Sequence, residues 1–188
     1  ASSSSRKAAT DAGERTPVPT LSFTDEMTIE LGGTTVELRY AGRNHSDSSI
    51  VMLLPAAGVA FAVDFIPVDA LPFQTLPDAY PAEWIESLRF VEETMDFDTL
   101  VIGHPPVQGT KENVGEVRAY LEDLTAAVED AQAAGLADNS PEMVEAVRGE
   151  LEADYGEWAN FEEWLPLNVE GLLAAWEASR DGAATPAA

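Results

Sequence analysis

Three short and almost entirely apolar runs constrain the fold of this chain more than any other feature. They are SIVMLLP at residues 49–55, GVAFAVD at 58–64 and DTLVIGH at 98–104. Runs of this length that are rich in Val, Ile and Leu predict strands covered on both faces. The first two runs are joined by a short turn at residues 56–58. Helices are therefore expected to pack against these strands.

The segments on either side of the runs have different periods. Upstream, apolar residues alternate with polar ones on both sides of Gly32-Gly33, which predicts a β-hairpin with a two-residue turn. Elsewhere, apolar residues recur at helical spacing and predict four helices. The expected helices span residues 81–93, opened by Pro81; 110–134, capped by Thr110; 141–154, capped by Ser140; and 160–179. The order predicts one layered α/β or α+β domain. We expect a flexible lead-in at 1–20 and a frayed tail at 181–188.

The composition excludes several classes of function. The chain has 10 Lys and Arg residues and 34 Asp and Glu residues, which gives a net charge of −24. Nucleic acids and anionic membranes require a basic surface, so neither is an expected partner. The chain has no cysteine, and no apolar run approaches the roughly 20 residues of a membrane helix. Residues 1–15 lack the apolar middle of a signal peptide, and we expect a soluble protein of undetermined location. The chain begins with Ala rather than Met, as expected for a processed product or a fragment.

Both histidines of the chain lie beside predicted strands. His45 is in the polar loop before the first apolar run, and His104 ends the third; Asp64 ends the second. Strand ends are where α/β folds place their sites, and two imidazoles with a carboxylate are a frequent zinc ligand set. The alternatives are surface histidines and an aspartate that forms a turn. The separations along the chain do not by themselves bring the three together.

These segments resemble the C-terminal half of the metallo-β-lactamase-fold metallo-hydrolases. The residues that carry the resemblance are Gly42-Arg43-Asn44-His45, Ala62-Val63-Asp64 and Val101-Ile102-Gly103-His104. It covers residues 19–124 and implies the second half of an αββα sandwich at residues 21–135, with a mixed sheet and helices on one face. Residues 136–180 are then a helical extension, similar to that of a bacterial subgroup.

The resemblance also implies a dinuclear zinc hydrolase. His45 binds one zinc, His104 binds the other and Asp64 bridges them as the catalytic carboxylate; iron and manganese are alternatives to zinc. A hydroxide held between the metals attacks an ester, lactone, thioester or amide carbonyl of a small-molecule substrate. The loop with Phe73 and Tyr80 is expected to shape the substrate pocket, with core packing as the alternative for both rings.

One departure from this family is large. The family's H-x-H-x-D-H run is absent, and two histidines do not supply all the ligands. We therefore expect weak metal binding and no activity unless the missing first half is present. Two alternatives remain. One is a non-catalytic binding or oligomerisation module whose apolar surface meets another partner or a second copy. The other is a mononuclear enzyme that uses only His45, Asp64 and His104.

Overall fold

The described part of the protein is built on one mixed sheet. The computed structural model describes residues 20–184, so nearly all of the predicted lead-in lies outside the described residues. Neighbouring strands are antiparallel except for β4 and β5, which are parallel. The strands lie side by side in chain order: β1 (Glu26–Leu31), β2 (Thr34–Tyr40), β3 (Ile50–Leu54), β4 (Val59–Phe61), β5 (Thr99–Val101) and β6 (Gln108–Thr110).

The first two strands form the hairpin that the sequence predicts. Leu31 pairs with Thr34, so Gly32 and Gly33 alone make the turn. Both glycines have positive φ, at 60° and 82°. A two-residue turn with positive φ at both positions matches the twist of the flanking strands, and glycine adopts it without steric cost. A short 3₁₀ turn, η1 (Pro55–Ala57), then joins β3 to β4.

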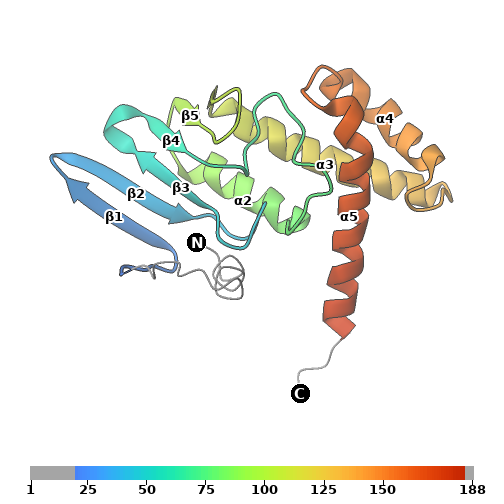
Figure 1. Ribbon diagram of the computed structural model, residues 1–188, viewed down its shortest axis with the longest axis horizontal. Coiled ribbons are helices and arrows are strands. Elements are labelled where there is room, and N and C mark those ends of the chain that lie inside the picture. The colour runs from blue at the N-terminus through green and yellow to red at the C-terminus, as the bar shows by residue number, and fades with distance from the viewer. Residues whose placement is uncertain (1–19, 185–188) are drawn as a thin grey trace, which may run out of the picture.

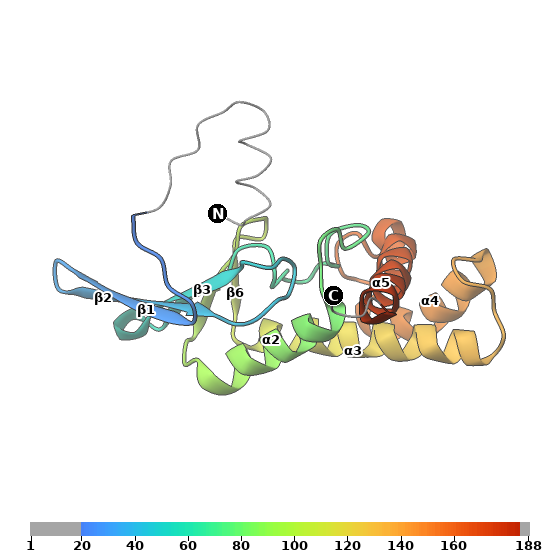
Figure 2. The same ribbon diagram turned by 90° about the horizontal axis from the view of Figure 1, so that it is seen from below.

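The helices follow the predicted order. They are α2 (Pro81–Thr94), α3 (Glu112–Ala133), α4 (Pro141–Tyr155) and α5 (Phe161–Ala184). Helices α2 and α3 lie on the same side of the sheet (Figure 2), while α4 and α5 lie beyond its end (Figure 1). We call α4 and α5 the helical extension; they join the core of α2, α3 and the sheet in one continuous cluster. None of the helices among residues 20–184 combines the length and hydropathy that a membrane span requires.

The two faces of the sheet differ in burial. On the side of α2 and α3, Val51, Ala60 and Leu100 are fully buried. Side chains alternate along a strand, so their neighbours point to the other side. We call that side the open face, because its apolar residues are mostly only half-buried and no helix of the described part packs on it (Figure 2). Its central members are Val36, Leu38, Ile50, Met52, Leu54, Val59, Phe61 and Val101. Burial of both faces was expected, and only one is buried within residues 20–184.

The main differences from the expected elements concern β6, the start of α3 and the end of α5. Thr110 does not cap α3: it belongs to β6, a strand that the sequence did not predict, and its amide donates to the side chain of Asn113 at 2.8 Å. Helix α3 begins at Glu112 after Lys111, which makes no side-chain cap. The extra strand forms because the chain after His104 turns back and pairs with β5. Ser140 caps α4 as predicted, and the backbone of α5 stays helical to Ala184, inside the tail expected to be frayed.

Candidate functional site

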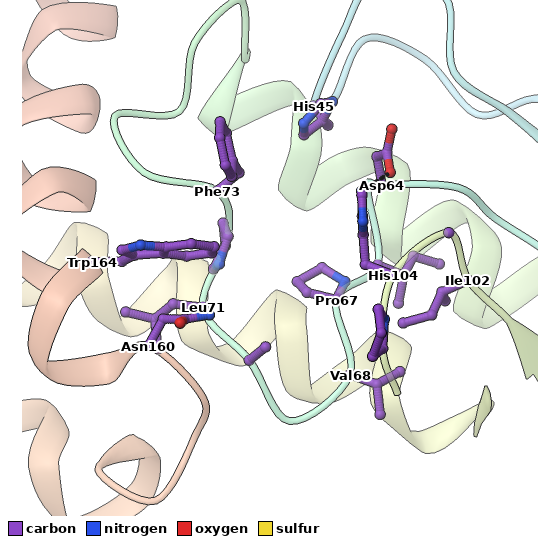
Figure 3. Close-up of a pocket in the computed structure, with 15 residues that line it drawn as sticks. His45, Asp64, Pro67, Val68, Leu71, Phe73, Ile102, His104, Asn160 and Trp164 are labelled. Carbon is purple, nitrogen blue, oxygen red and sulfur yellow. Dashed lines mark ion pairs between the residues drawn. The ribbon is translucent and has the colours of Figure 1, made fainter. Parts of the chain in front are cut away.

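The strand directions bring the three predicted donors to one edge of the sheet. Strand β3 is antiparallel to both β2 and β4, and β5 is parallel to β4, so β2, β4 and β5 all run the same way. Their carboxyl ends therefore meet at the same edge. His45 lies in the loop after β2, Asp64 follows β4 and His104 follows β5. All three side chains line one cavity (Figure 3).

Two of these side chains are in direct contact. Nε2 of His104 lies 2.9 Å from Oδ1 of Asp64. The His104 side chain is 79% exposed and that of Asp64 is 39% exposed, so solvent reaches both. Gly103 makes this approach possible: a Cβ there would lie 2.8 Å from Val63 Cγ1 and 3.1 Å from the same carboxylate oxygen. Both residues of the Gly103-His104 pair therefore matter: Gly103 leaves room for the contact, and His104 provides the imidazole.

The backbone of Asp64 is held in a turn that few residues adopt. Its φ is 67°, in the left-handed region. The amide of Phe65 donates to the carbonyl of Val63 at 2.8 Å and closes the turn around Asp64. Aspartate tolerates the left-handed region better than most residues, but the conformation still costs free energy and needs support from its surroundings. That support aims the carboxylate at the cavity.

His45 is held by the aromatic core beneath it. The ring centroids of His45 and Trp84 are 5.7 Å apart, with an interplanar angle of 89°. Burial lowers the pKa of His45, and the nearby carboxylates of Asp64 and Asp78 oppose that shift only in part. The imidazole is therefore neutral at physiological pH, which leaves one ring nitrogen with a lone pair.

The cavity extends well beyond the three donors. Its volume is about 520 Å³, within the range of small-molecule sites. Phe73 and Trp164 line the opposite side (Figure 3), with ring centroids 5.4 Å apart and an interplanar angle of 82°. Phe73 comes from the loop between β4 and α2, whereas Trp164 comes from α5. The sequence singled out Phe73 but not Trp164, because nothing along the chain indicates that α5 returns to this loop.

Tyr80, the other aromatic residue expected at the pocket, lies outside the lining of this cavity. It directly precedes α2, and its amide donates to the carbonyl of Asn44 at 2.9 Å. The guanidinium of Arg43 lies 4.3 Å from the centroid of its ring. Tyr80 thus connects α2 to the loop of His45 rather than facing the cavity.

The donors are of the right chemistry for a metal ion, but their number is small. Imidazole and carboxylate groups suit zinc, iron and manganese. Among residues 20–184, however, no group of three or more His, Asp or Glu side chains is gathered closely enough to hold an ion. The described residues therefore bring the His104–Asp64 pair and His45 to one cavity, but they do not form a complete metal site.

Comparison with known proteins identifies the fold. No protein-family model matches the sequence, and no curated protein matches it. Many solved structures match, and two examples each match with a probability of 1.00. A metallo-β-lactamase from Pontibacter korlensis shares 21% identity at a TM-score of 0.52, over 64% of this chain. TMB-1, described for its substrate and inhibitor binding, shares 18% identity at a TM-score of 0.53, over 66% of this chain.

The match confirms the fold class expected from the sequence. The mixed six-stranded sheet with its helices is that of a metallo-β-lactamase fold. The alignment covers only 56% of each of the two solved structures. This chain therefore spans little more than half the length of the proteins whose fold it shares.

Proposed function

We propose that this chain is the C-terminal part of a metal-dependent hydrolase of the metallo-β-lactamase fold. In this proposal His45, Asp64 and His104 supply part of a dinuclear zinc centre, and the part of the fold that the chain lacks supplies the other ligands. The observation that carries the proposal is that three loops, far apart along the chain, bring these donors to one cavity at one edge of the sheet.

Each of the three residues has a distinct role in the proposed site. Burial keeps His45 neutral and able to donate its lone pair. The Asp64 carboxylate has two oxygens, which lets it serve two ions, and its turn fixes the direction in which they point. Nε2 of His104 lies 2.9 Å from Oδ1 of that carboxylate, so the two groups are close enough to bind the same ion. Bound metal ions would supply a Lewis acid for a carbonyl oxygen and would lower the pKa of a bound water.

The open face supports the idea of a second layer. A sheet that is apolar on both faces is stable when both are covered, and contiguous exposed apolar surfaces mark sites of contact. Phe61 and Met52 pair directly across β3 and β4 at the centre of the open face and are only half-buried. In the proposal, the missing part of the fold covers this surface and at the same time completes the metal centre.

The same surface favours one other candidate function. If a second copy of the chain covers the open face, the chain is a non-catalytic oligomerisation module. The two candidates differ in metal content and in partner, and one experiment separates them.

The test measures metal and association together. The chain is purified alone and with a polypeptide that carries the first half of the fold and its H-x-H-x-D-H run. Zinc, iron and manganese are measured by mass spectrometry, association by light scattering, and hydrolysis on a panel of ester, thioester, lactone and amide substrates. We expect little metal on the chain alone and about two ions in the complex. His45→Ala, Asp64→Ala and His104→Ala should each lower the metal content. The matched control is Asp47→Ala, in the loop of His45.

Two results would count against the proposal. One is a complex that forms but takes up no more metal than the chain alone. The other is a metal content that does not change in the three alanine variants. A metal-free dimer of the chain that dissociates in Phe61→Glu would instead support the oligomerisation module.

A further inference from the structure

The cavity has two walls of different chemistry. His45, Asp64 and His104 lie on one wall, and the opposite wall is mostly apolar (Figure 3). We call the second the apolar wall; its residues are Leu71, Pro72, Phe73 and Trp164, and the polar side chain of Asn160 lies beside them. No Lys or Arg is among the residues that line the cavity. A ligand that fills the whole cavity must therefore combine a polar group at one end with an apolar part at the other.

The helical extension builds the apolar wall. Ala70, in the loop between β4 and α2, forms a parallel β-bridge with Ala159, which lies just before α5. The amide of Leu71 donates to the carbonyl of Ala159 at 3.1 Å, and the amide of Ala159 donates to the carbonyl of Asp69 at 2.8 Å. Trp164 then enters the cavity from the first turns of α5. The wall is thus a joint product of the loop and the extension.

A buried amide fixes the same loop a second time. Asn168, in the N-terminal half of α5, is 0% exposed. Its side-chain amide donates to the carbonyls of Pro72 and Gln74, at 3.0 Å and 2.7 Å. Its side-chain oxygen accepts a hydrogen bond of 2.8 Å from the hydroxyl of Tyr120. Leaving any hydrogen-bonding group of a buried network unpaired costs free energy. These hydrogen bonds therefore hold the backbone that carries Phe73 against α5.

The apolar wall still exposes surface that a ligand can cover. Leu71 is almost fully buried and forms its base, at 1% exposure, whereas Phe73 is 47% exposed. Edge-to-face packing on the half-buried Trp164 holds the Phe73 ring in place. Burial of apolar surface in a preformed cavity is favourable, and here the rings are already positioned before any ligand arrives.

We propose that the helical extension gives this site an apolar subsite for uncharged acyl substrates. The hydrocarbon part of the acyl group lies against Phe73 and Trp164, and its carbonyl lies on the side of Asp64 and His104. An uncharged substrate is the better fit because no cationic side chain lines the cavity and the net charge of −24 repels anions. Only the role of the carbonyl as the reacting group rests on the proposed function. The apolar subsite is inferred from the residues that line the cavity.

The test uses two neutral ketones that differ in chain length. 2-Octanone and 2-butanone carry the same carbonyl and no bond that hydrolysis can cleave. Each is titrated into the chain in the presence of EDTA and followed by two-dimensional NMR. We expect 2-octanone to bind about tenfold more tightly or better, because each added methylene buries further apolar surface. Trp164→Ala and Phe73→Ala should each lower its affinity about fivefold and change 2-butanone binding by less than about twofold.

Trp176→Ala is the matched control, because Trp176 is a half-buried tryptophan of the same helix that does not line the cavity. It should leave the affinity for 2-octanone unchanged. Equal affinities for the two ketones would overturn the proposal, as would a loss of 2-octanone binding in Trp176→Ala but not in Trp164→Ala. Phe73→Ala keeps the test decisive if Trp164→Ala fails to fold. EDTA removes any metal, so ketone binding tests the apolar subsite independently of the proposed metal centre. The metal measurements likewise test the proposed function independently of the apolar subsite.

Discussion

The indole nitrogen of Trp84 donates a hydrogen bond of 2.8 Å to the main-chain carbonyl of Phe65, the residue that follows Asp64. The same indole ring meets His45 edge-on. One fully buried side chain of α2 therefore supports two of the three candidate donors, which belong to loops after different strands.

Trp84→Phe should destabilise the fold and loosen this support. The substitution leaves the carbonyl of Phe65 without its donor and removes part of a buried ring. We expect a loss of about 2 kcal/mol in the free energy of unfolding, measured by urea denaturation. Trp176→Phe changes a half-buried tryptophan of α5 and should cost less than about 1 kcal/mol. Equal losses in the two variants would show that the hydrogen bond to Phe65 contributes nothing.

Replacement of Asn168 should free the loop that carries Phe73. Asn168→Ala removes three hydrogen bonds from a buried position, and we expect a loss of about 3 kcal/mol in the free energy of unfolding. Asn168→Asp retains the acceptor for Tyr120 but not the donors to Pro72 and Gln74. Both variants should therefore speed amide hydrogen exchange in the loop at residues 70–76. Unchanged exchange in Asn168→Asp would mean that the bridge at Ala70 and Ala159 alone holds the loop.

Gly171→Ala should be strongly unfavourable, although alanine favours helices. A Cβ at Gly171 would lie 2.2 Å from the carbonyl oxygen of Thr75, which is backbone and has no rotamer to change. We expect a loss of roughly 2 kcal/mol or more in the free energy of unfolding. Gly149→Ala is the control within α4, where a Cβ meets nothing within 4 Å, and it should gain about 0.5–1 kcal/mol. A gain in both variants would contradict the close approach of α5 to the loop.

Asp64→Gly should stabilise the isolated chain while it removes the candidate bridging carboxylate. Glycine adopts a φ of 67° without steric cost, so the strain of the turn disappears. We expect a gain of about 1 kcal/mol in the free energy of unfolding, measured by urea denaturation in EDTA. Asp64→Ala also lacks the carboxylate but retains a Cβ, and it should show no such gain. A similar gain in the free energy of unfolding in both variants would mean that it comes from loss of the charge and not from relief of backbone strain.

The stability of the chain should depend on pH through His45. Burial makes its pKa in the folded state lower than in the unfolded state, so the unfolded chain binds the proton more readily. The contribution of His45 to stability is therefore complete above about pH 6.5, and it is lost as the pH falls through the lower folded-state pKa. In EDTA, the free energy of unfolding of the native chain should fall more steeply between pH 7.5 and pH 5 than that of His45→Gln. Parallel curves for the two proteins would contradict the lowered pKa.

Local patterns in the sequence predicted most of the elements because those elements are local. The alternation around Gly32-Gly33, the start of α2 at Pro81 and the cap of α4 at Ser140 depend on residues a few positions apart. Strand β6 was missed because Gln108–Thr110 has no apolar pattern of its own. It is a strand only because β5 provides a partner for its backbone.

The candidate site was predictable in its chemistry but not in its extent. Histidine and aspartate at strand ends are visible in the sequence, so His45, Asp64 and His104 were named from it. Trp164 and Asn168 were not named, although a single Asn among the apolar residues of a helix is a signal of a buried hydrogen bond. Tyr80 was named for the pocket and lies against Arg43 instead, since the direction of a loop side chain depends on neighbours that the sequence does not identify.

The sequence by itself determined most of the strands and helices, the strong negative charge, and the presence of only two histidines and no cysteine, because each of these depends on residue identity and short-range spacing. Only the tertiary structure decided that three loops meet at one edge, that α5 returns to form the second wall of the cavity, and that one face of the sheet remains half-exposed. These features depend on contacts between residues that are tens of positions apart. Such contacts form through packing and backbone pairing of the whole domain, which no short stretch of sequence encodes.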